Sequence, residues 1–599
     1  MPRMLRLPRL LRLFLLLVLS APLTAAIADS AALAALFSDY DTAYLQLNPH
    51  DSTSRGDRRF DDRLEDGISP TWLEREGEMV SEYLGRLDAI DRSTLTPREQ
   101  VSADTFRFSL ELLRDRHNGG FARAQSLMPL TQFNGMHIEL PQLGSGSGIQ
   151  PFETADDHRR WLARAAQWPA WADQSIANMR EGIREGVVLP RVVAERLLPQ
   201  LAAHIVDSPE KSVFWGAVAK LPAGPEGKGL EAQYRELIST RMVPAYRKLR
   251  DFVATEYLPA TRASVGRSAL PNGAAWYALD IRQHTTLRRD AGQIHDIGLA
   301  QVALLHREME KVRDLLGYKG DLKTFFAAVR EDPRWAFKDE KTALAAFTDM
   351  KARVRAELPG LFGRLPKADY EVRPVEAYRA AAAAGGSYQR PDAAGKRRGV
   401  FYLNTSDLSR TPSFELVSLS LHEAEPGHHF QNTLAVENTA LPGFQRFGWV
   451  TAFGEGWALY AETLGQPMGF YDDPAQYLGY LHNRLFRAIR LVVDTGMHAK
   501  GWTREQSIRY FMENSPNAEA DVTADTERYI AWPGQALAYL SGALEIQRLR
   551  EEAAATLGKD FDLRSFHDEV LVDGIVPLEV LGGKISRWTA AQAAVEPAR

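Results

Sequence analysis

One short segment limits how this chain can fold. Residues 421–431 read Leu-His-Glu-Ala-Glu-Pro-Gly-His-His-Phe-Gln and place three histidines and two glutamates within eight residues, behind an apolar helical run. Catalytic zinc sites use three protein ligands drawn from His, Cys or carboxylate side chains and leave a fourth position for water. Because the chain contains no cysteine, histidine and carboxylate must supply the ligands. The segment therefore predicts a metal site.

The segment begins like the hydrolytic motif His-Glu-x-x-His and then departs from it. In that motif two histidines four residues apart share one helical face, and the glutamate between them takes a proton from water. Here proline occupies position 426, where the second histidine would stand, and the next histidines are His428 and His429. On a regular helix, i+6 points away from His422, and i+7 sits about 10 Å further along the axis. Neither could share an ion with His422 on such a helix.

Pro426 and Gly427 provide a local solution. Proline lacks an amide hydrogen and clashes with the preceding turn, and glycine tolerates unusual backbone dihedral angles. We therefore predict a bulge that absorbs the Pro-Gly pair and favours His428 as the second ligand. His429 is then a neighbour that contacts substrate or supports the ligands, and the reverse assignment of the two histidines stays open.

The third ligand is expected from residues 452–463, Ala-Phe-Gly-Glu-Gly-Trp-Ala-Leu-Tyr-Ala-Glu-Thr. Glu455 lies between Gly454 and Gly456, which permit close backbone approach, and it heads a run of helix-forming residues. Glu462 lies two turns further on the same face and is suited to accept a hydrogen bond from a ligand imidazole. The alternative is two solvated helix carboxylates, but the apolar neighbours predict burial, which an unpaired carboxylate resists.

These residues predict a hydrolytic centre. His422, His428 and Glu455 would hold one Zn²⁺ ion with water in the fourth position. Another divalent ion is an alternative, since two histidines and a carboxylate suit several metals. Glu423 would act as the general base that activates this water and would then pass the proton to the leaving amine.

The chain as a whole resembles a known family. The block His-Glu-x-x-Pro-Gly-His-His is followed by Gly-Glu-Gly-Trp-Ala-x-Tyr-x-Glu, then by Arg528-Tyr529 and by Pro-Gly-Gln-Ala-Leu-Ala-Tyr at 533–539. With segments 129–135 and 293–299, these motifs resemble the DUF885 family of bacterial proteins, whose members are similar to zinc metallopeptidases of the helical gluzincin type. The resemblance implies a mainly α, zincin-like metallopeptidase fold with a small β-sheet beside a deep cleft.

The resemblance also implies roles for residues near the C-terminal end of the domain. In peptidases of this type a Tyr or His donor there stabilises the oxyanion, so Tyr529 is expected to polarise the scissile carbonyl and Arg528 to bind a substrate carboxylate. Tyr539 is the alternative hydroxyl and a further substrate contact. A tyrosine in an apolar helix more often packs its ring and bonds its hydroxyl locally, so packing alone is the competing interpretation.

Residues 399–405, Gly-Val-Phe-Tyr-Leu-Asn-Thr, predict a short strand directly before the metal helix. The resemblance implies that this is an edge strand that binds an extended peptide by strand addition. The alternative is a strand that only packs beside the cleft. Downstream, Phe414, Val417 and Leu421 recur on one helical face, so the metal helix is expected to be anchored in the core.

Residues 1–28 predict a signal peptide. Four arginines form a basic start, residues 13–23 are apolar, and Ala-Ile-Ala at 26–28 offers a small-x-small cleavage site. The apolar stretch is shorter than the ~20 residues that span a membrane and contains a proline, which favours a leader over an anchor. With no cysteine for lipid attachment, a lipoprotein is not expected. The mature protein is predicted to be secreted, periplasmic in a Gram-negative cell, and without a membrane anchor after cleavage.

Charge and motifs exclude other classes of protein. Cleavage would leave 68 basic against 77 acidic residues, a formal net charge of −9. A nucleic-acid partner is not expected, because duplex binding needs a basic face and no dense Lys/Arg tract occurs. Serine hydrolase or nucleotide chemistry also lacks support, because no Gly-x-Ser-x-Gly elbow or phosphate-binding loop is present.

Length would allow three or four domains, but no low-complexity linker or internal repeat divides the chain. Residues 29–599 are therefore predicted to form a single catalytic unit, with two lobes about a cleft as one arrangement and the metal-site core at about 399–556. Amphipathic helices are expected at 154–186, 294–317, 341–357, 414–425, 475–500 and 535–556.

The expected function is an exported zinc-dependent peptidase that hydrolyses peptide bonds of short peptides. A zinc amidase acting on cell-wall peptides would use the same ligands. A non-catalytic peptide-binding factor on a peptidase scaffold would have lost the base or a ligand, whereas His422, Glu423 and Glu455 are all present. The sequence carries no signal for the oligomeric state.

Overall fold

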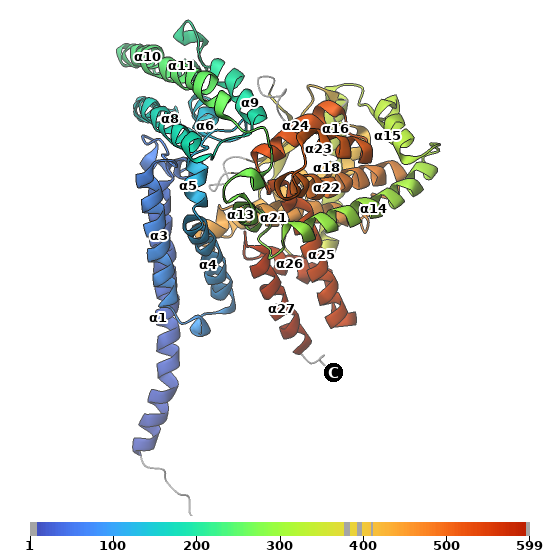
Figure 1. Cartoon of the computed structure of the whole chain (residues 1–599). Coiled ribbons are helices and arrows are strands. Elements are labelled where there is room, and N and C mark those ends of the chain that lie inside the picture. Colours follow the sequence, from blue (N-terminus) through green and yellow to red (C-terminus); the bar gives the residue numbers. More distant parts are fainter. Residues whose placement is uncertain (1–8, 377–383, 392–397, 409–410, 595–599) are drawn as a thin grey trace, which may run out of the picture.

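Helices make up most of the chain, so the prediction of a mainly α protein with a small sheet is confirmed (Figure 1). The computed structural model describes residues 9–376, 384–391, 398–408 and 411–594, with side chains from residue 27 onward. Every helical stretch expected from the periodicity is present. The stretch at 154–186 is divided in two, because proline at position 169 lies in the first turn of a new helix.

The first half of the chain supplies the helices that gather on one side of the molecule in Figure 1. They are α1 (Arg9–Leu47), α2 (Pro49–Ser54), α3 (Pro70–Asp88), α4 (Pro97–Asn118), α5 (Phe121–Ser126), α6 (Met136–Gly144), α7 (Ala155–Ala165), α8 (Trp168–Glu185), α9 (Arg191–Ala202), α10 (Pro225–Leu237), α11 (Val243–Phe252), α12 (Leu258–Ala260) and α13 (Gly273–Thr285). The last of them, α13, leads to the other side.

The second half supplies the helices of the other side. They are α14 (Ala291–Leu315), α15 (Leu322–Glu331), α16 (Glu340–Leu361), α18 (Leu416–Glu423), α19 (His428–Glu437), α20 (Gly443–Arg446), α21 (Thr451–Glu462), α22 (Pro474–Lys500), α23 (Arg504–Asn514), α24 (Glu519–Ala531), α25 (Ala538–Leu557), α26 (Leu563–Leu571) and α27 (Leu578–Ala594).

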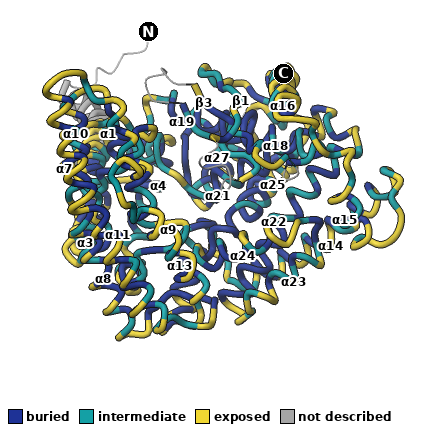
Figure 2. The backbone as a smooth tube through the Cα atoms, turned by 90° about the horizontal axis from the view of Figure 1, so that it is seen from above, coloured by how far each residue is buried: buried dark blue, intermediate teal, exposed yellow. Residues whose placement is uncertain are grey.

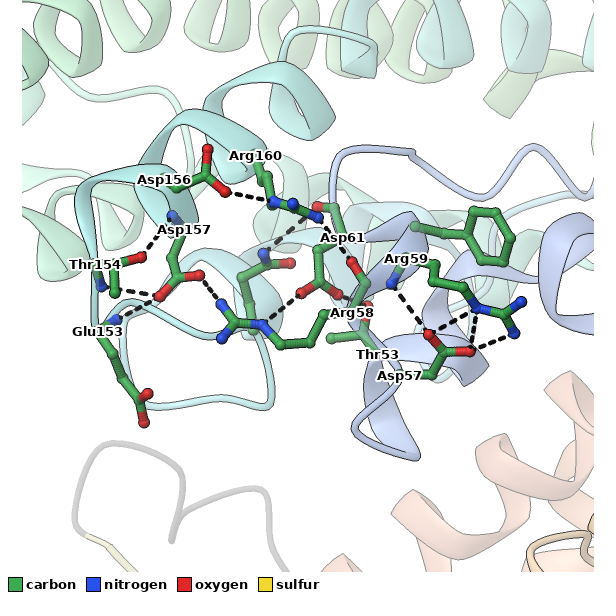
Figure 3. Close-up of polar contacts among 12 residues, drawn as sticks. Thr53, Asp57, Arg58, Arg59, Asp61, Glu153, Thr154, Asp156, Asp157 and Arg160 are labelled. Carbon is green, nitrogen blue, oxygen red and sulfur yellow. Dashed lines mark hydrogen bonds and ion pairs between the residues drawn. The ribbon is translucent and has the colours of Figure 1, made fainter.

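An ionic network ties residues 53–61 to α7 on the first side (Figure 3). Arg58 pairs with Asp157 and lies 3.6 Å from Asp61. Thr154 caps α7 by accepting from the Asp157 amide, while the Asp157 carboxylate accepts from the Thr154 amide. Because buried carboxylates are stable only when paired or hydrogen-bonded, this network fixes the start of α7.

The sheet has the strand order β1-β3-β2 and contains β1 (Tyr370–Pro374), β2 (Gly386–Gln389) and β3 (Gly399–Leu403). β3 runs parallel to β1 and antiparallel to β2. The strand predicted at 399–405 is therefore present but central, and its prediction as an edge strand is wrong. The sequence of β2, Gly-Ser-Tyr-Gln, has no apolar alternation, so the strand that covers this edge of β3 gives no periodic signal.

The helices around the predicted metal motif form the buried centre of the second side (Figure 2). α21 packs closely on α25, where a Cβ added to Gly456 would lie 2.5 Å from the Cα of Gly542. Trp457 and Leu459 of α21 are fully buried. α18 lies against both α21 and α22. The metal motif is thus carried by helices that packing holds in place.

α1 runs unbroken from Arg9 to Leu47, so the predicted cleavage position after residue 28 lies inside this helix. The side chains of most of the predicted leader lie outside the described residues. In the part of the chain that the structure describes, no helix combines the length and apolar character needed to cross a membrane. One apolar core cluster includes residues from both sides of the molecule, from Ile68 to Ile585.

Candidate metal centre

The His-Glu-x-x-Pro-Gly-His-His block forms two helices joined by a tight turn. α18 ends at Glu423 and α19 begins at His428, and the Glu425–Pro426 peptide bond between them is cis. The bulge predicted within one helix is therefore a complete break. Its first residue, Ala424, has φ −108° and ψ −106°, outside the helical region. On a regular helix His428 would point away from His422. The break between α18 and α19 instead brings the two side chains together.

Gly427 makes this close return of the chain sterically allowed. A Cβ at Gly427 would lie 1.9 Å from the carbonyl oxygen of His422 and 2.4 Å from that of Leu421. Trp457 holds the turn from the other side, since its indole Nε1 donates to the carbonyl oxygen of Pro426 at 2.8 Å. The Gly-Glu-Gly-Trp motif therefore has two parts: Trp457 fixes the turn, and Glu455, two residues earlier, joins the cluster.

His422, His428 and Glu455 converge at one point. The Nε2 atoms of His422 and His428 lie 3.6 Å and 3.3 Å from Glu455 Oε2, and one ligand atom from each residue lies within 4.8 Å of the others. Four ligands placed tetrahedrally at zinc distances are about 3.4 Å apart. The three side chains therefore fit a single zinc-sized ion, with His428 rather than His429 in the second position.

Glu462 orients the first histidine. Its Oε1 lies 2.8 Å from His422 Nδ1, and both side chains are buried. A carboxylate at this position accepts a proton from Nδ1 and turns Nε2 toward Glu455, the nitrogen that would be left to bind a metal. The contact predicted for Glu462 is present.

The charges of the cluster are coupled. Burial lowers the pKa of His422, but hydrogen bonds to Glu455 and Glu462 outweigh it and raise the pKa to about 9. Burial raises the pKa of Glu455, yet His428 and His422 together hold it far below its usual value. The carboxylate is thus ionised and the imidazole that faces it is readily protonated, so a cation that binds here takes the place of a proton.

Glu423, the predicted general base, is the last residue of α18 and is buried. It lies under β2, because a Cβ added to Gly386 would be 3.3 Å from Glu423 Cγ. Trp449 lies on the other side of the cluster, with its ring 6.0 Å from that of His428 and half of its surface exposed. Sequence reasoning missed Trp449, which lies just before the Gly-Glu-Gly-Trp segment.

His429 does not lie in the cluster, and its prediction as a substrate contact is wrong. Its side chain is fully enclosed. Its Nδ1 lies 2.9 Å from the hydroxyl of Tyr388 in β2, and its Nε2 lies 3.1 Å from the carbonyl oxygen of Ala368. Burial lowers its pKa to about 3. The two ring nitrogens therefore join α19 to β2 and to the segment that precedes β1.

The predicted Arg-Tyr pair has protein partners. Tyr529 is 1% exposed, and its hydroxyl accepts a hydrogen bond from Arg490 Nε at 2.9 Å. Arg528 pairs with Asp525 at 2.9 Å and donates to Gln535 Oε1 at 3.2 Å. Arg528 is therefore already neutralised by a carboxylate of its own helix.

Tyr539, the alternative hydroxyl, is only partly buried. Its hydroxyl accepts from Gln535 Nε2 at 3.3 Å, and the guanidinium of Arg490 lies 4.8 Å from the centre of its ring. Arg490 thus contacts both tyrosines. Sequence reasoning missed this arginine, although it closes the run Arg484-Leu-Phe-Arg487-Ala-Ile-Arg490, whose spacing of three residues is visible in the sequence.

A cavity of about 180 Å³ lies at the C-terminal end of α24. Its walls include Trp532, His284 and the ion pair between Arg267 and Asp280, whose Nε and Oδ2 atoms are 2.9 Å apart. None of the three clustered ligands lines this cavity. The deep cleft expected at the metal centre stays a prediction.

Fold and site together define a mainly helical protein with a buried cluster of two histidines and one glutamate on its second side. The chain belongs to the DUF885 family of bacterial proteins of unknown function, whose profile matches residues 49–585. Among curated proteins, none matches the chain.

Two solved structures are similar over nearly the whole chain. One is described as "the putative lipoprotein from Colwellia psychrerythraea", with 30% sequence identity, a TM-score of 0.85, and coverage of 93% of this chain and 99% of the other. The second is "a putative lipoprotein of unknown function from Shewanella oneidensis", with 20% identity, a TM-score of 0.66, and coverage of 92% and 99%. The second likeness concerns the fold alone.

Proposed function

We propose that this chain is an exported, zinc-dependent peptidase that hydrolyses peptide bonds of short peptides. The observation that carries the proposal is the convergence of His422, His428 and Glu455 at separations that fit one zinc-sized ion, with Glu462 behind His422. Three ligands of this type leave a position open, which is the pattern of catalytic rather than structural zinc sites. Glu423, next to the first ligand, supplies the carboxylate that such chemistry needs.

Each residue of the candidate site has a defined task in this proposal. When bound, the ion supplies a Lewis acid and lowers the pKa of a water molecule. Glu423 takes a proton from the attacking water and delivers it to the leaving amine. A tyrosine hydroxyl donates to the oxyanion; Tyr529 is the residue predicted for this task, and its bond from Arg490 leaves its own proton free to donate.

A zincin-like arrangement is part of the proposal. It is supported by the order of the parts along the chain: a His-Glu pair ends one helix, a second histidine begins the next, and a glutamate follows on a third helix. Export is supported by the basic and apolar start of the chain and by the description of the similar structure from Colwellia psychrerythraea as a putative lipoprotein.

Metal analysis combined with a peptide library tests the proposal. We expect the purified protein to hold one zinc ion per chain and to cleave short peptides in a mixed library, with cleavage lost in chelator and restored by zinc. Cleavage of wall fragments but not of ordinary peptides would indicate the amidase alternative. A protein that holds zinc but hydrolyses neither substrate class would contradict the proposal.

Replacing Glu462 with glutamine should weaken metal binding. Glutamine can still accept a hydrogen bond from His422 Nδ1, but it lacks the charge that makes the imidazole a better ligand, so zinc affinity should fall about 10-fold. Competition titration with a chelating dye measures the affinity. Glu513→Gln, at an exposed position, serves as the control, and equal affinities for both variants would remove the orienting role from Glu462.

A further inference from the structure

Three arginines on α22 lack acidic partners. Arg484 and Arg490 are more than nine-tenths buried, and Arg487 is partly buried. Within the described residues, no carboxylate oxygen lies within 4.0 Å of any of the three guanidinium groups. Their neighbours are neutral: Arg484 donates to Gln547 at 3.4 Å and Arg487 to Asn483 at 2.7 Å.

Each of these arginines also has a buried nitrogen without an acceptor. These atoms are the NH1 nitrogens of Arg484 and Arg490 and the Nε of Arg487. The guanidinium of Arg490 lies between aromatic rings, 4.0 Å from the ring centre of Phe486 and 4.8 Å from that of Tyr539. Buried cations are costly unless they are paired and hydrogen-bonded. Arg490 is partly compensated by these rings and by its bond to Tyr529, but the unused donors of the three arginines would suit an anion.

Tyr539 lies on α25, the helix that packs against the helix of Glu455. Its ring lies within 6 Å of the guanidinium groups of Arg487 and Arg490. Tyr539 lies three residues, or about one helical turn, before Gly542. Gly542 packs directly on Gly456, the residue that follows the Glu455 ligand.

A second contact leads to the other metal helix. Asn483, one turn before Arg487 on α22, donates from Nδ2 to the hydroxyl of Ser418 at 2.7 Å. Ser418 lies one turn before His422 on α18. The arginine cluster is therefore linked through Asn483 to α18, which carries His422, and through α25 to α21, which carries Glu455.

We propose that Arg487 and Arg490 bind the C-terminal carboxylate of a peptide substrate, which makes this protein a peptidase that acts from the C-terminal end. The inference rests on the proposed peptidase function. A guanidinium fork matches a carboxylate with two parallel hydrogen bonds. Arg528, for which this role was predicted, is instead neutralised by Asp525.

The reaction follows from ordinary hydrolysis. One amide C–N bond near the C-terminus breaks, the hydroxyl of water joins the acyl carbon, and a proton passes to the leaving amine. The leaving fragment carries the free carboxylate that the arginines hold. No further reactant is required.

Matched peptides test the inference on the unaltered, zinc-loaded protein. One short peptide is offered as its free acid and as its C-terminal amide, and products are identified by mass spectrometry. We expect kcat/KM to be roughly 10- to 100-fold higher for the acid, in line with the strength of charged hydrogen bonds, and the products to be fragments released from the C-terminal end.

Variants of the arginines test whether they cause the preference for the free acid over the amide. Arg490→Met and Arg487→Gln should reduce the preference for the acid, mainly through KM, while Arg548→Gln, a solvent-facing arginine paired with Glu545 and Glu552, should leave it unchanged. Zinc content and thermal unfolding show which variants are folded. Because the peptide pair is compared on the wild type as well, the result does not depend on a buried variant.

The outcomes separate this inference from the proposed function. Efficient cleavage of acid and amide at equal rates would overturn the carboxylate site and leave the peptidase intact. Equal stimulation of both reactions by chloride or phosphate, without preference for the acid, would assign the arginines to an inorganic anion and also overturn it. If no peptide is cleaved, calorimetric binding decides: equal affinity for acid and amide overturns the site.

Discussion

Replacing Glu423 with glutamine is expected to lower peptide hydrolysis by about 10²- to 10⁴-fold, the range over which a general acid-base group contributes. Glutamine has almost the same shape but cannot take a proton from water. The metal ligands His422, His428 and Glu455 are unaltered, so the variant should still hold one zinc ion. Initial rates on a short peptide, normalised to zinc content, measure the effect.

Glu425→Gln provides the matched control two residues away. The Glu425 carboxylate is buried and paired with Arg355 at 2.7 Å, so this variant should be less stable, yet each folded, zinc-loaded molecule should turn over at a rate close to that of the wild type. Turnover retained by Glu423→Gln, or lost equally in both variants, would remove the general-base role from Glu423.

Replacing His428 with alanine should abolish both zinc binding and hydrolysis. Without this imidazole, only His422 and Glu455 remain in the cluster, which is too few ligands for a catalytic zinc site. The thermal stabilisation by added zinc should disappear with the site. In the wild type, zinc at about 100 times its dissociation constant would raise the free energy of unfolding by about 2.7 kcal/mol. Metal analysis and thermal unfolding with and without zinc measure these effects.

The adjacent histidine is the control. His429→Gln should destabilise the protein, because both nitrogens of His429 bond to protein groups in a fully enclosed position, but it should keep one zinc ion per chain. Zinc retained by His428→Ala and lost from His429→Gln would reverse the assignment of the two histidines and contradict the geometry of the cluster.

Much of the site could be predicted because metal chemistry depends on residue type and local spacing. A chain without cysteine must use His and carboxylate, and the His-Glu pair at 422–423 and the glutamate of Gly-Glu-Gly-Trp are short, recognisable patterns. The helices were predictable for the same reason. Apolar periodicity can be recognised within ten to twenty consecutive residues. Accordingly, α14, α16 and α22 begin and end within a few residues of the predicted limits.

The errors concern contacts between distant segments. From the sequence, His429 could be a ligand or a substrate contact. In the structure its ring nitrogens contact Tyr388 and Ala368, which lie about 40 and 60 residues earlier in the chain. The strand predicted at 399–405 was placed at an edge by the family resemblance, but β2, whose sequence has no apolar alternation, pairs with it.

The roles of the arginines could not be predicted from the sequence for the same reason, because they depend on which groups pack around them. Arg528 belongs to a conspicuous Arg-Tyr pair, but Asp525 neutralises it within its own helix. Arg487 and Arg490 belong to an ordinary amphipathic helix. Only the packing of α22 against α24 and α25 leaves Arg490 buried and Arg487 partly buried, with no carboxylate partner for either among the described residues.

The sequence by itself therefore determined the mainly helical fold, the residue types of the candidate metal site, and two of the three residues in its cluster. The tertiary structure decided which histidine completes the cluster, which strand is central, and which arginines have no carboxylate partner in the described part of the chain. The physical reason is that helix periodicity and ligand type are properties of neighbouring residues, whereas the direction of a buried side chain depends on every group that packs around it.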